Sequence, residues 1–189
     1  MSERSDLYRS YRIHKRDIVF LGDSITDGGC WEEFFPGISV KNRGINGDTT
    51  SGVLARIDDI LCCEPLAIFI LIGTNDLNWW TQRQDNEILS TYQRILEQCR
   101  INSPKTRVYV QSILPRAKRY AKHIQRLNRE LEGIAGRFGF SFLNLYPYFA
   151  DQSDQLKTEF TNDRLHLMAA GYDQWVKILA PILDHLIEK

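Results

Sequence analysis

Short runs of apolar residues recur along the chain, and they are typical of buried β-strands. The five runs are Asp17–Leu21, Ile38–Lys41, Leu66–Ile72, Arg107–Ser112 and Phe140–Leu145. The third run, LAIFILI, is apolar throughout, which is typical of a central parallel strand that helices cover on both faces. The pattern therefore predicts a five-stranded sheet with its most buried strand in the middle of the chain.

The segments between these runs carry apolar residues at helical spacing. The four predicted helical faces are Val53, Leu54, Ile57, Ile60 and Leu61; Ile88, Tyr92, Ile95 and Cys99; Ile124, Leu127, Leu131, Ile134 and Phe138; and Tyr172, Trp175, Leu179, Ile182 and Leu186. Strands that alternate with helices favour an α/β fold, in which helices cover both faces of a parallel sheet. Ligands bind such sheets beyond the carboxyl ends of the strands, so the segments that follow each strand are the candidate site.

Composition indicates an ordinary globular protein. The chain has 189 residues, of which 43% are hydrophobic, and we expect one domain over residues 1–189 with residues 1–16 as an N-terminal extension or helix. Lysine plus arginine and aspartate plus glutamate balance at 24 each, which gives no overall bias toward nucleic acid. The N-terminus is too charged for a signal peptide, and no apolar run approaches the roughly 18 residues of a membrane span. We therefore expect a cytoplasmic protein.

Ser24 directly follows the first predicted strand, in the sequence Gly22-Asp23-Ser24. This position places the hydroxyl at the carboxyl edge of the sheet, where Gly22 permits a tight exit and the following N–H groups can hold an oxyanion. A helix N-cap is the other interpretation, because Ser and Asp are favoured there. The motif G-x-S-x-G is absent, so the usual nucleophile elbow of α/β-hydrolases is not expected.

Two more polar segments follow predicted strands. The Asn75 amide in Gly73-Thr74-Asn75-Asp76 can donate a hydrogen bond into the site, although these residues are also common in turns. In residues 42–48, Gly44 lets the backbone approach a ligand closely and offer its N–H. Asp48 or Thr49 is expected to cap the next helix.

Asp163 and His166 are three residues apart, just before the last predicted helix. This spacing lets the carboxylate fix the tautomer of the imidazole, as a hydrolytic triad requires. A capping Asp beside a surface His is the alternative. The remaining histidines, His14, His123 and His185, are expected on the solvated surface. Together, the polar segments supply a nucleophile, a base, an orienting acid and oxyanion donors, which are the parts that acyl transfer needs.

With the blocks GDSIT, NRGINGDTT, GTND and DRLHL in this order, the sequence resembles the SGNH hydrolase superfamily, also called GDSL esterases and lipases. Within it, the chain looks most like the platelet-activating-factor acetylhydrolase-like acyl-ester hydrolases. The resemblance implies a flavodoxin-like, three-layer α/β/α fold with a five-stranded parallel sheet, and no metal or cofactor. One departure is Arg164, where relatives commonly place Gly.

The resemblance also implies a role for each matching residue. Ser24 is the expected nucleophile, His166 its general base and Asp163 the partner of His166. The N–H groups of Ser24 and Gly44 and the side chain of Asn75 are the expected oxyanion hole. This combination is that of a serine esterase.

Three tryptophans give an indication of the size and type of the substrate. Trp31, Trp79 and Trp80 fall in segments expected near the catalytic edge, where indole rings can line a small acyl pocket or stack on a sugar-like leaving group. Packing of loops onto the sheet is the alternative. No insertion is long enough for an obvious lid, so we expect a small-molecule ester with a short acyl group such as acetyl. A homo-oligomer is possible.

Two other functions fit parts of the sequence. Asp23, Asp27, Asp76 and Asp163 can gather at one edge and bind Mg²⁺ through oxygen, as in a metal-dependent phosphohydrolase. This alternative does not explain Ser24 or Asn75. The second alternative is a catalytically silent binding subunit on the same fold, against which the full set of catalytic residues argues.

Overall fold

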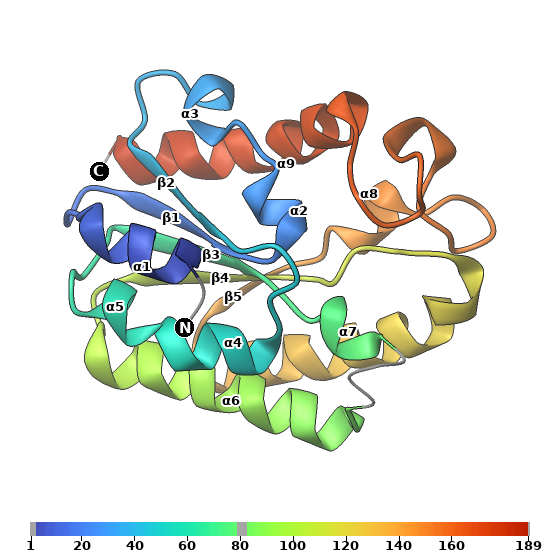
Figure 1. The fold of residues 1–189 in the computed structure, drawn as a ribbon, viewed down its shortest axis with the longest axis horizontal. Helices are drawn as coiled ribbons and strands as arrows, with labels where there is room; N and C mark the ends of the chain where they lie inside the picture. Colours follow the sequence, from blue (N-terminus) through green and yellow to red (C-terminus); the bar gives the residue numbers. More distant parts are fainter. Residues whose placement is uncertain (1–2, 79–82, 189) are drawn as a thin grey trace.

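Five parallel strands form the centre of the computed structural model, which describes residues 3–78 and 83–188 (Figure 1). The strands are β1 (Ile18–Gly22), β2 (Val40–Gly44), β3 (Ala67–Leu71), β4 (Arg107–Gln111) and β5 (Ser141–Leu143). Their order in the sheet is β2-β1-β3-β4-β5, and every neighbouring pair is parallel. This is the flavodoxin-like order that was expected.

Strand β2 extends beyond its predicted end. The apolar pattern placed its end at Lys41, whereas the strand continues to Gly44. It is an edge strand that pairs only with β1, and Lys41 and Asn42 are half-buried. Polar side chains are tolerated at an edge, so the apolar pattern ends before the backbone pairing does.

Helices connect the strands. The α-helices are α1 (Glu3–Ser10), α2 (Ser24–Asp27), α3 (Trp31–Phe34), α4 (Thr50–Arg56), α5 (Asp58–Leu61), α6 (Asp85–Asn102), α7 (Ala121–Arg137), α8 (Tyr146–Phe149) and α9 (Ala169–Ile187). Short 3₁₀ turns are η1 (Asn75–Leu77), η2 (Lys118–Tyr120) and η3 (Thr158–Phe160). None of the helices in the described ranges is long and apolar enough to cross a membrane.

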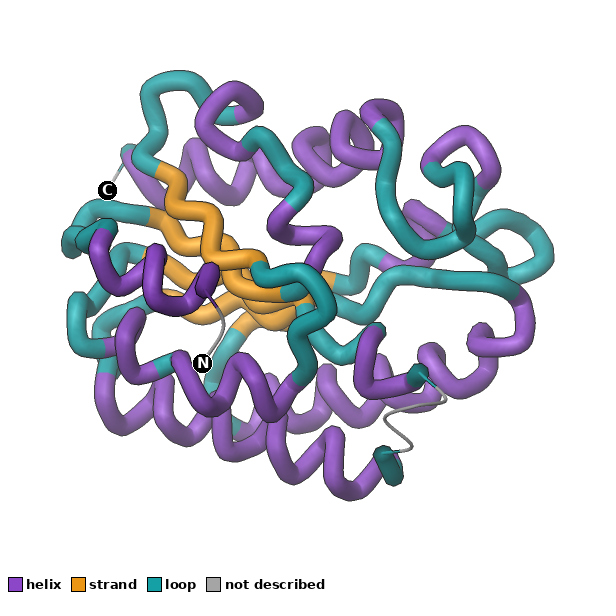
Figure 2. The backbone as a smooth tube through the Cα atoms, in the orientation of Figure 1, coloured by secondary structure: helices purple, strands orange, loops and turns teal. Residues whose placement is uncertain are grey.

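Alternate residues of each strand face two separate apolar cores. Val19 and Leu21 of β1 pack with helices α4 to α7, whereas Phe20 between them packs with α2, α3 and α9. Figure 2 shows the same arrangement as a sheet between two helical layers. The fold is therefore the three-layer α/β/α sandwich that was predicted, and both cores leave the carboxyl edge of the sheet to the connecting loops.

Candidate active site

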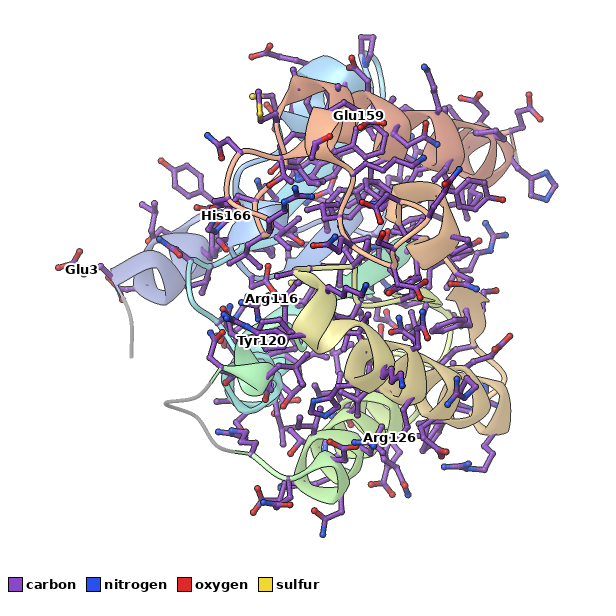
Figure 3. The ribbon with its side chains drawn as sticks, turned by 90° about the vertical axis from the view of Figure 1, so that its right-hand side faces the viewer. Glu3, Arg116, Tyr120, Arg126, Glu159 and His166 are labelled. Atoms are coloured by element: carbon purple, nitrogen blue, oxygen red, sulfur yellow. The ribbon has the colours of Figure 1, made fainter. Side chains whose placement is uncertain are left out.

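The carboxyl edge of the sheet gathers the polar segments that the sequence singled out. Figure 3 looks onto this edge, from which His166 projects on the segment that leads into α9. Ser24 begins α2 directly after β1, and Asn75 begins η1 after β3. Parallel strands end at the same edge, and this brings residues that are far apart in the sequence together.

Ser24, His166 and Asp163 form a continuous hydrogen-bonded chain. The Ser24 Oγ atom lies 3.0 Å from His166 Nε2, and His166 Nδ1 lies 2.6 Å from Asp163 Oδ2. The other carboxylate oxygen of Asp163 accepts the backbone N–H groups of Leu165 and His166, each at 2.8 Å. When Nδ1–H donates to the ionised carboxylate, the imidazole presents the Nε2 lone pair to the serine hydroxyl.

Asp163 is held in its charged form. Burial raises its pKa, but hydrogen bonds from the His166 ring and from the N–H groups of His166 and Leu165 outweigh burial and lower the pKa to about 2. The carboxylate is therefore ionised at neutral pH and able to hold a proton on the imidazole.

Arg164 occupies a position where the backbone favours glycine. Its φ angle is 64°, in the left-handed region. Its guanidinium donates to the Leu156 carbonyl at 3.0 Å, and its N–H donates to Thr161 Oγ1 at 3.0 Å. Glycine adopts this backbone conformation without strain, and the bonds to Leu156 and Thr161 hold the arginine in it.

Asp23, not Ser24, is the N-cap of α2. Its Oδ1 accepts the N–H of Ile25 at 2.9 Å, and Ser24 is the first helical residue. The side chain of Asp23 is completely buried, and burial raises its pKa to about 7. The capping interpretation therefore holds for the neighbour of Ser24, while the Ser24 hydroxyl reaches His166.

The Asn75 amide is held at both ends. Its Nδ2 donates to the Asp48 carbonyl at 2.9 Å, and its Oδ1 accepts Asn78 Nδ2 at 3.3 Å. Thr49 is the N-cap of α4, as expected, and Asp76 accepts both the N–H and the hydroxyl of Thr50, at 3.0 and 2.7 Å. The loop after β2 and the loop after β3 are thus joined across the site.

The contacts of Gly44 revise its expected role. Its N–H donates to Asn42 Oδ1 at 2.9 Å, so this donor is already used within the chain. A Cβ at Gly44 would lie 2.1 Å from the backbone nitrogen of Asp27, so the close approach is to α2 and not to a ligand. The glycine is required for packing of α2 on β2.

Gly47 is a nearby glycine that the sequence analysis did not single out as a backbone donor. It lies in a turn closed by the bond from Asp48 N to Ile45 O at 3.1 Å, with φ of 74°. Gly47 is exposed, and within the described ranges its N–H has no acceptor. The Asn46-Gly47 dipeptide, a strong turn signal, was the available clue.

Trp31 is not part of the site. Its ring is 1% exposed, stacks on Phe20 with centroids 4.2 Å apart and meets Trp175 of α9 edge-on at 4.8 Å. The expectation that Trp31 contacts substrate is therefore wrong, because α3 turns this ring into the core. Trp79 and Trp80 lie outside the described residues.

Arg116 is a further residue near this edge whose role was not predicted. Its Nη1 donates to the Thr74 carbonyl at 3.0 Å and to Asn78 Oδ1 at 3.2 Å. The guanidinium lies 4.3 Å from the centre of the Tyr120 ring, and Figure 3 shows the two side by side. Arg116 thereby braces the segment that carries Asn75.

The four aspartates considered for Mg²⁺ each have their own protein contacts. Asp23 caps α2, Asp76 accepts Thr50, Asp163 accepts His166, and Asp27 lies 3.5 Å from the hydroxyl of Tyr8. In the part of the chain that the structure describes, no group of three or more His, Cys, Asp or Glu residues is placed to hold a metal ion.

Comparison with known proteins agrees with this geometry. A hydrogen-bonded serine, histidine and aspartate at one edge of a sheet are typical of hydrolases that act through serine. Residues 20–174 match the GDSL-like lipase/acylhydrolase family. The chain belongs to this family, and it is an enzyme of the esterase and acylhydrolase class.

Individual relatives cover most of the chain. Platelet-activating factor acetylhydrolase IB subunit alpha1 from Homo sapiens is 27% identical and covers 90% of this chain and 77% of its own. A solved structure from Streptococcus pneumonia, named for platelet activating factor, is 30% identical with a TM-score of 0.86. The match covers 96% of this chain and 91% of that structure's chain. A GDSL-like lipase from Bacteroides thetaiotaomicron is 25% identical with a TM-score of 0.86, covering 97% of both chains.

Proposed function

We propose that this chain is a serine esterase in which Ser24 is the nucleophile, His166 the general base and Asp163 the residue that orients His166. The observation that carries this proposal is the unbroken path from Ser24 Oγ through both ring nitrogens of His166 to the Asp163 carboxylate, with steps of 3.0 and 2.6 Å. Each step is within the distance over which a proton is transferred or held.

The reaction follows from this path. Ser24 Oγ attacks the acyl carbon while His166 Nε2 takes the hydroxyl proton, and the ionised Asp163 stabilises the resulting imidazolium. Collapse of the tetrahedral intermediate breaks the bond to the leaving alcohol, which receives the proton from Nε2. Water then attacks the acyl-serine by the same sequence of proton transfers, releasing the carboxylic acid and restoring Ser24.

The oxyanion donors in this proposal are the Ser24 N–H, the Asn75 side chain and the Gly47 N–H. Gly47 replaces the initially expected Gly44 because Gly44 donates to Asn42 Oδ1. Hydrogen bonds at both ends of the Asn75 amide keep it preorganised, which is what makes such donors effective. Backbone amide shifts test the choice of glycine: phosphonylation of Ser24 is expected to move the Gly47 amide proton downfield and leave that of Gly44 unchanged.

The proposed substrate is a small ester with a short acyl group, acetyl above all. Support comes from the curated relatives in the acetylhydrolase group, which are 25–28% identical over most of the chain. The catalytic histidine and aspartate side chains are 48% and 45% exposed, so a small ester reaches them directly from solvent.

A covalent label tests the assignment of the nucleophile. A fluorophosphonate is expected to modify Ser24, and Ser24→Ala is expected to abolish both labelling and ester hydrolysis, because no other hydroxyl is bonded to His166 in the described structure. Peptide mass spectrometry identifies the modified residue. Ser90→Ala, an exposed serine on α6, is the matched control and should label normally. An adduct found only on another residue contradicts the proposal.

A further inference from the structure

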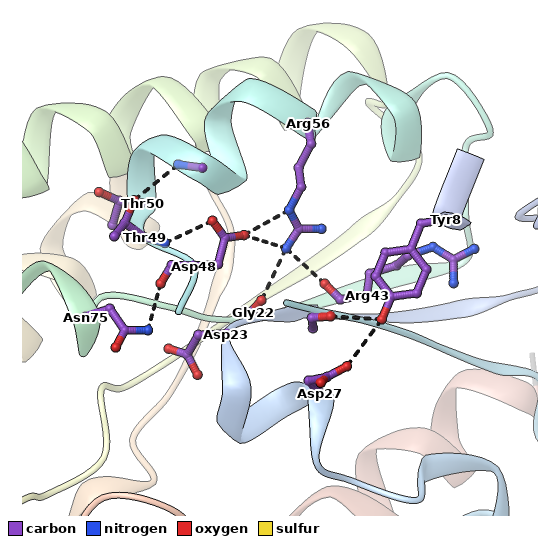
Figure 4. Close-up of polar contacts among 12 residues, drawn as sticks. Tyr8, Gly22, Asp23, Asp27, Arg43, Asp48, Thr49, Thr50, Arg56 and Asn75 are labelled. Carbon is purple, nitrogen blue, oxygen red and sulfur yellow. Dashed lines mark hydrogen bonds and ion pairs between the residues drawn. The ribbon is translucent and has the colours of Figure 1, made fainter. Parts of the chain in front are cut away.

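Arg56 lies beneath the candidate active site and bonds to three acceptors at once. It is the last residue of α4 and is only 9% exposed. Its Nη2 donates to the Gly22 carbonyl at 3.2 Å and to the Arg43 carbonyl at 3.0 Å, and its Nε donates to Asp48 Oδ2 at 2.9 Å. Figure 4 shows these bonds converging on one guanidinium.

Two of the three acceptors, Gly22 and Asp48, lie close in sequence to residues of the proposed catalytic machinery. Gly22 lies two positions before Ser24, at the end of β1. Asp48 directly follows Gly47, and the Asp48 carbonyl accepts the Asn75 amide at 2.9 Å. One side chain therefore connects the nucleophile segment to the loop that carries Gly47 and, through the Asp48 carbonyl, to the Asn75 amide on the loop after β3.

Thr49 and Gly52 fix the position of the Asp48 carboxylate. Its Oδ1 accepts the N–H of Thr49 at 2.9 Å, and a Cβ at Gly52 would lie only 1.7 Å from the same oxygen. Glycine at position 52 thus makes room for the carboxylate to reach Arg56. Burial raises the pKa of Asp48, and the charge and hydrogen bonds of Arg56 oppose that rise.

Only a guanidinium has the donor geometry for this arrangement. Arginine offers several N–H groups in a fixed plane, whereas a lysine ammonium is a compact charge on a flexible stem. Arg43, the neighbouring buried arginine, donates to Asn42 O and Tyr11 O and not to Gly22 or Asp48. Arg43 therefore provides a comparison within the same region.

We infer that Arg56, paired with Asp48, is a positioning residue that fixes the oxyanion donors relative to Ser24. This inference rests on the proposed esterase function. Arg56 does not touch substrate; it sets the distances between the Gly22–Ser24 segment, the Gly47 turn and the Asn75 amide. Its loss changes the rate of acyl transfer more than the binding of the ester.

The test measures kcat and KM for p-nitrophenyl acetate, with enzyme concentration taken from stoichiometric phosphonate titration of Ser24. Arg56→Gln and Arg56→Lys are expected to lower kcat per titrated site by about 10- to 100-fold with KM nearly unchanged, because small misplacements of donors cost this much. Lysine keeps the charge and the fold while losing the three-way bond, so it gives a folded variant if glutamine does not. Arg43→Gln is the control and is expected to keep kcat per titrated site.

The partner residue gives an independent measurement. Asp48→Asn keeps the acceptor for Thr49 but loses the charge pair with Arg56, whose Nη2 lies 2.8 Å from Asp48 Oδ2. It is expected to lower kcat similarly, and the double variant with Arg56→Gln is expected to be no worse than either single variant, as for residues that act as a unit.

Two results overturn the inference. One is kcat per titrated site at the wild-type value in both Arg56 variants. The other is a fall that Arg43→Gln reproduces, which indicates general loosening of the core. Failure of the proposed function is distinct: wild-type enzyme would then show no phosphonate adduct at Ser24, whatever the state of Arg56.

Discussion

Within the catalytic edge, single hydrogen bonds decide what each residue contributes. Asp163 accepts two backbone N–H groups and the Nδ1–H of His166. The loop that carries the imidazole therefore orients it independently of its contact with Ser24. The N–H of Gly44 donates to Asn42, whereas that of Gly47 has no acceptor within the described ranges. Residue type alone does not distinguish them.

Removal of the Asn75 amide tests oxyanion stabilisation at this scale. Asn75→Ala is expected to lower kcat by about 10²–10³-fold with little change in KM, because the donor acts mainly on the charge that develops in the transition state. Steady-state kinetics on p-nitrophenyl acetate provide the measurement. Asn102→Ala, at the exposed end of α6, is the control. An unchanged kcat with acylation rate-limiting removes Asn75 from the oxyanion hole.

Activity is expected to fall as the pH drops below neutral, because His166 accepts the Ser24 proton only as a neutral imidazole. Asp163 does not cause this loss: its folded pKa of about 2 lies below the ordinary value of 3.8, so its stabilising charge is present at neutral pH and lost only in strong acid. The measurement is kcat/KM between about pH 4.5 and 9.

Asp23 needs a separate control in that experiment, because burial raises its pKa to about 7, inside the measured range. Asp23→Asn keeps the acceptor for the Ile25 N–H and removes the titration. If the acidic fall persists in Asp23→Asn, it belongs to the imidazole. A profile that becomes flat in this variant assigns the fall to Asp23 instead.

The short helices, rather than the long ones, position the residues of the candidate site. Helix α2 has four residues, starts on the Asp23 cap and carries Ser24 at its first position. Its close fit on β2 depends on Gly44, and Trp31 of α3 locks the same region against α9. The long helices α6 and α9 supply the apolar cores that keep these short elements in place.

The Trp31→Ala variant therefore tests how α3 is packed against the core, and not a contact with substrate. Loss of this buried ring is expected to lower the free energy of unfolding by about 3–5 kcal/mol, as for other large-to-small core changes. Denaturant unfolding measures the change, with Glu32→Ala on the exposed face of α3 as the control. In the folded fraction, KM for p-nitrophenyl acetate should be unaltered. A changed acyl preference at full stability would return Trp31 to the substrate pocket.

For the whole molecule, the open edge of the sheet predicts the range of substrates. The hydrogen-bonded serine and histidine lie at a surface where the His166 side chain is 48% exposed. Along p-nitrophenyl esters from acetate to palmitate, kcat/KM is expected to be highest for acetate and to fall with chain length, because an open edge offers a long acyl chain little apolar surface to bury. Initial rates below micelle-forming concentrations provide the comparison, and a maximum at octanoate or beyond contradicts it.

The sequence by itself determined the class of fold and the chemistry. Buried strands need apolar runs and their helices need apolar faces, so β1, β3 and β4 were located to within a residue or two. The carboxyl-edge rule then selected Ser24, Asn75, Asp163 and His166 before any coordinates. Ser24 and Asn75 lie just after strands, and Asp163 and His166 lie in the loop that leads into α9, so position along the chain already indicates position in space.

Only the tertiary structure decided which groups support them. Arg56 reaches Gly22 and Arg43 across the core, and Arg116 reaches Thr74 and Asn78, through bonds between residues 13 to 42 positions apart. Such partners depend on how layers pack, which no local pattern records. The burial of Trp31 was not predicted for the same reason, because the direction of its ring depends on how α9 packs against the sheet. The choice of Gly47 over Gly44 in the proposed oxyanion hole likewise needed the structure, because only the folded chain shows which backbone N–H already has an acceptor.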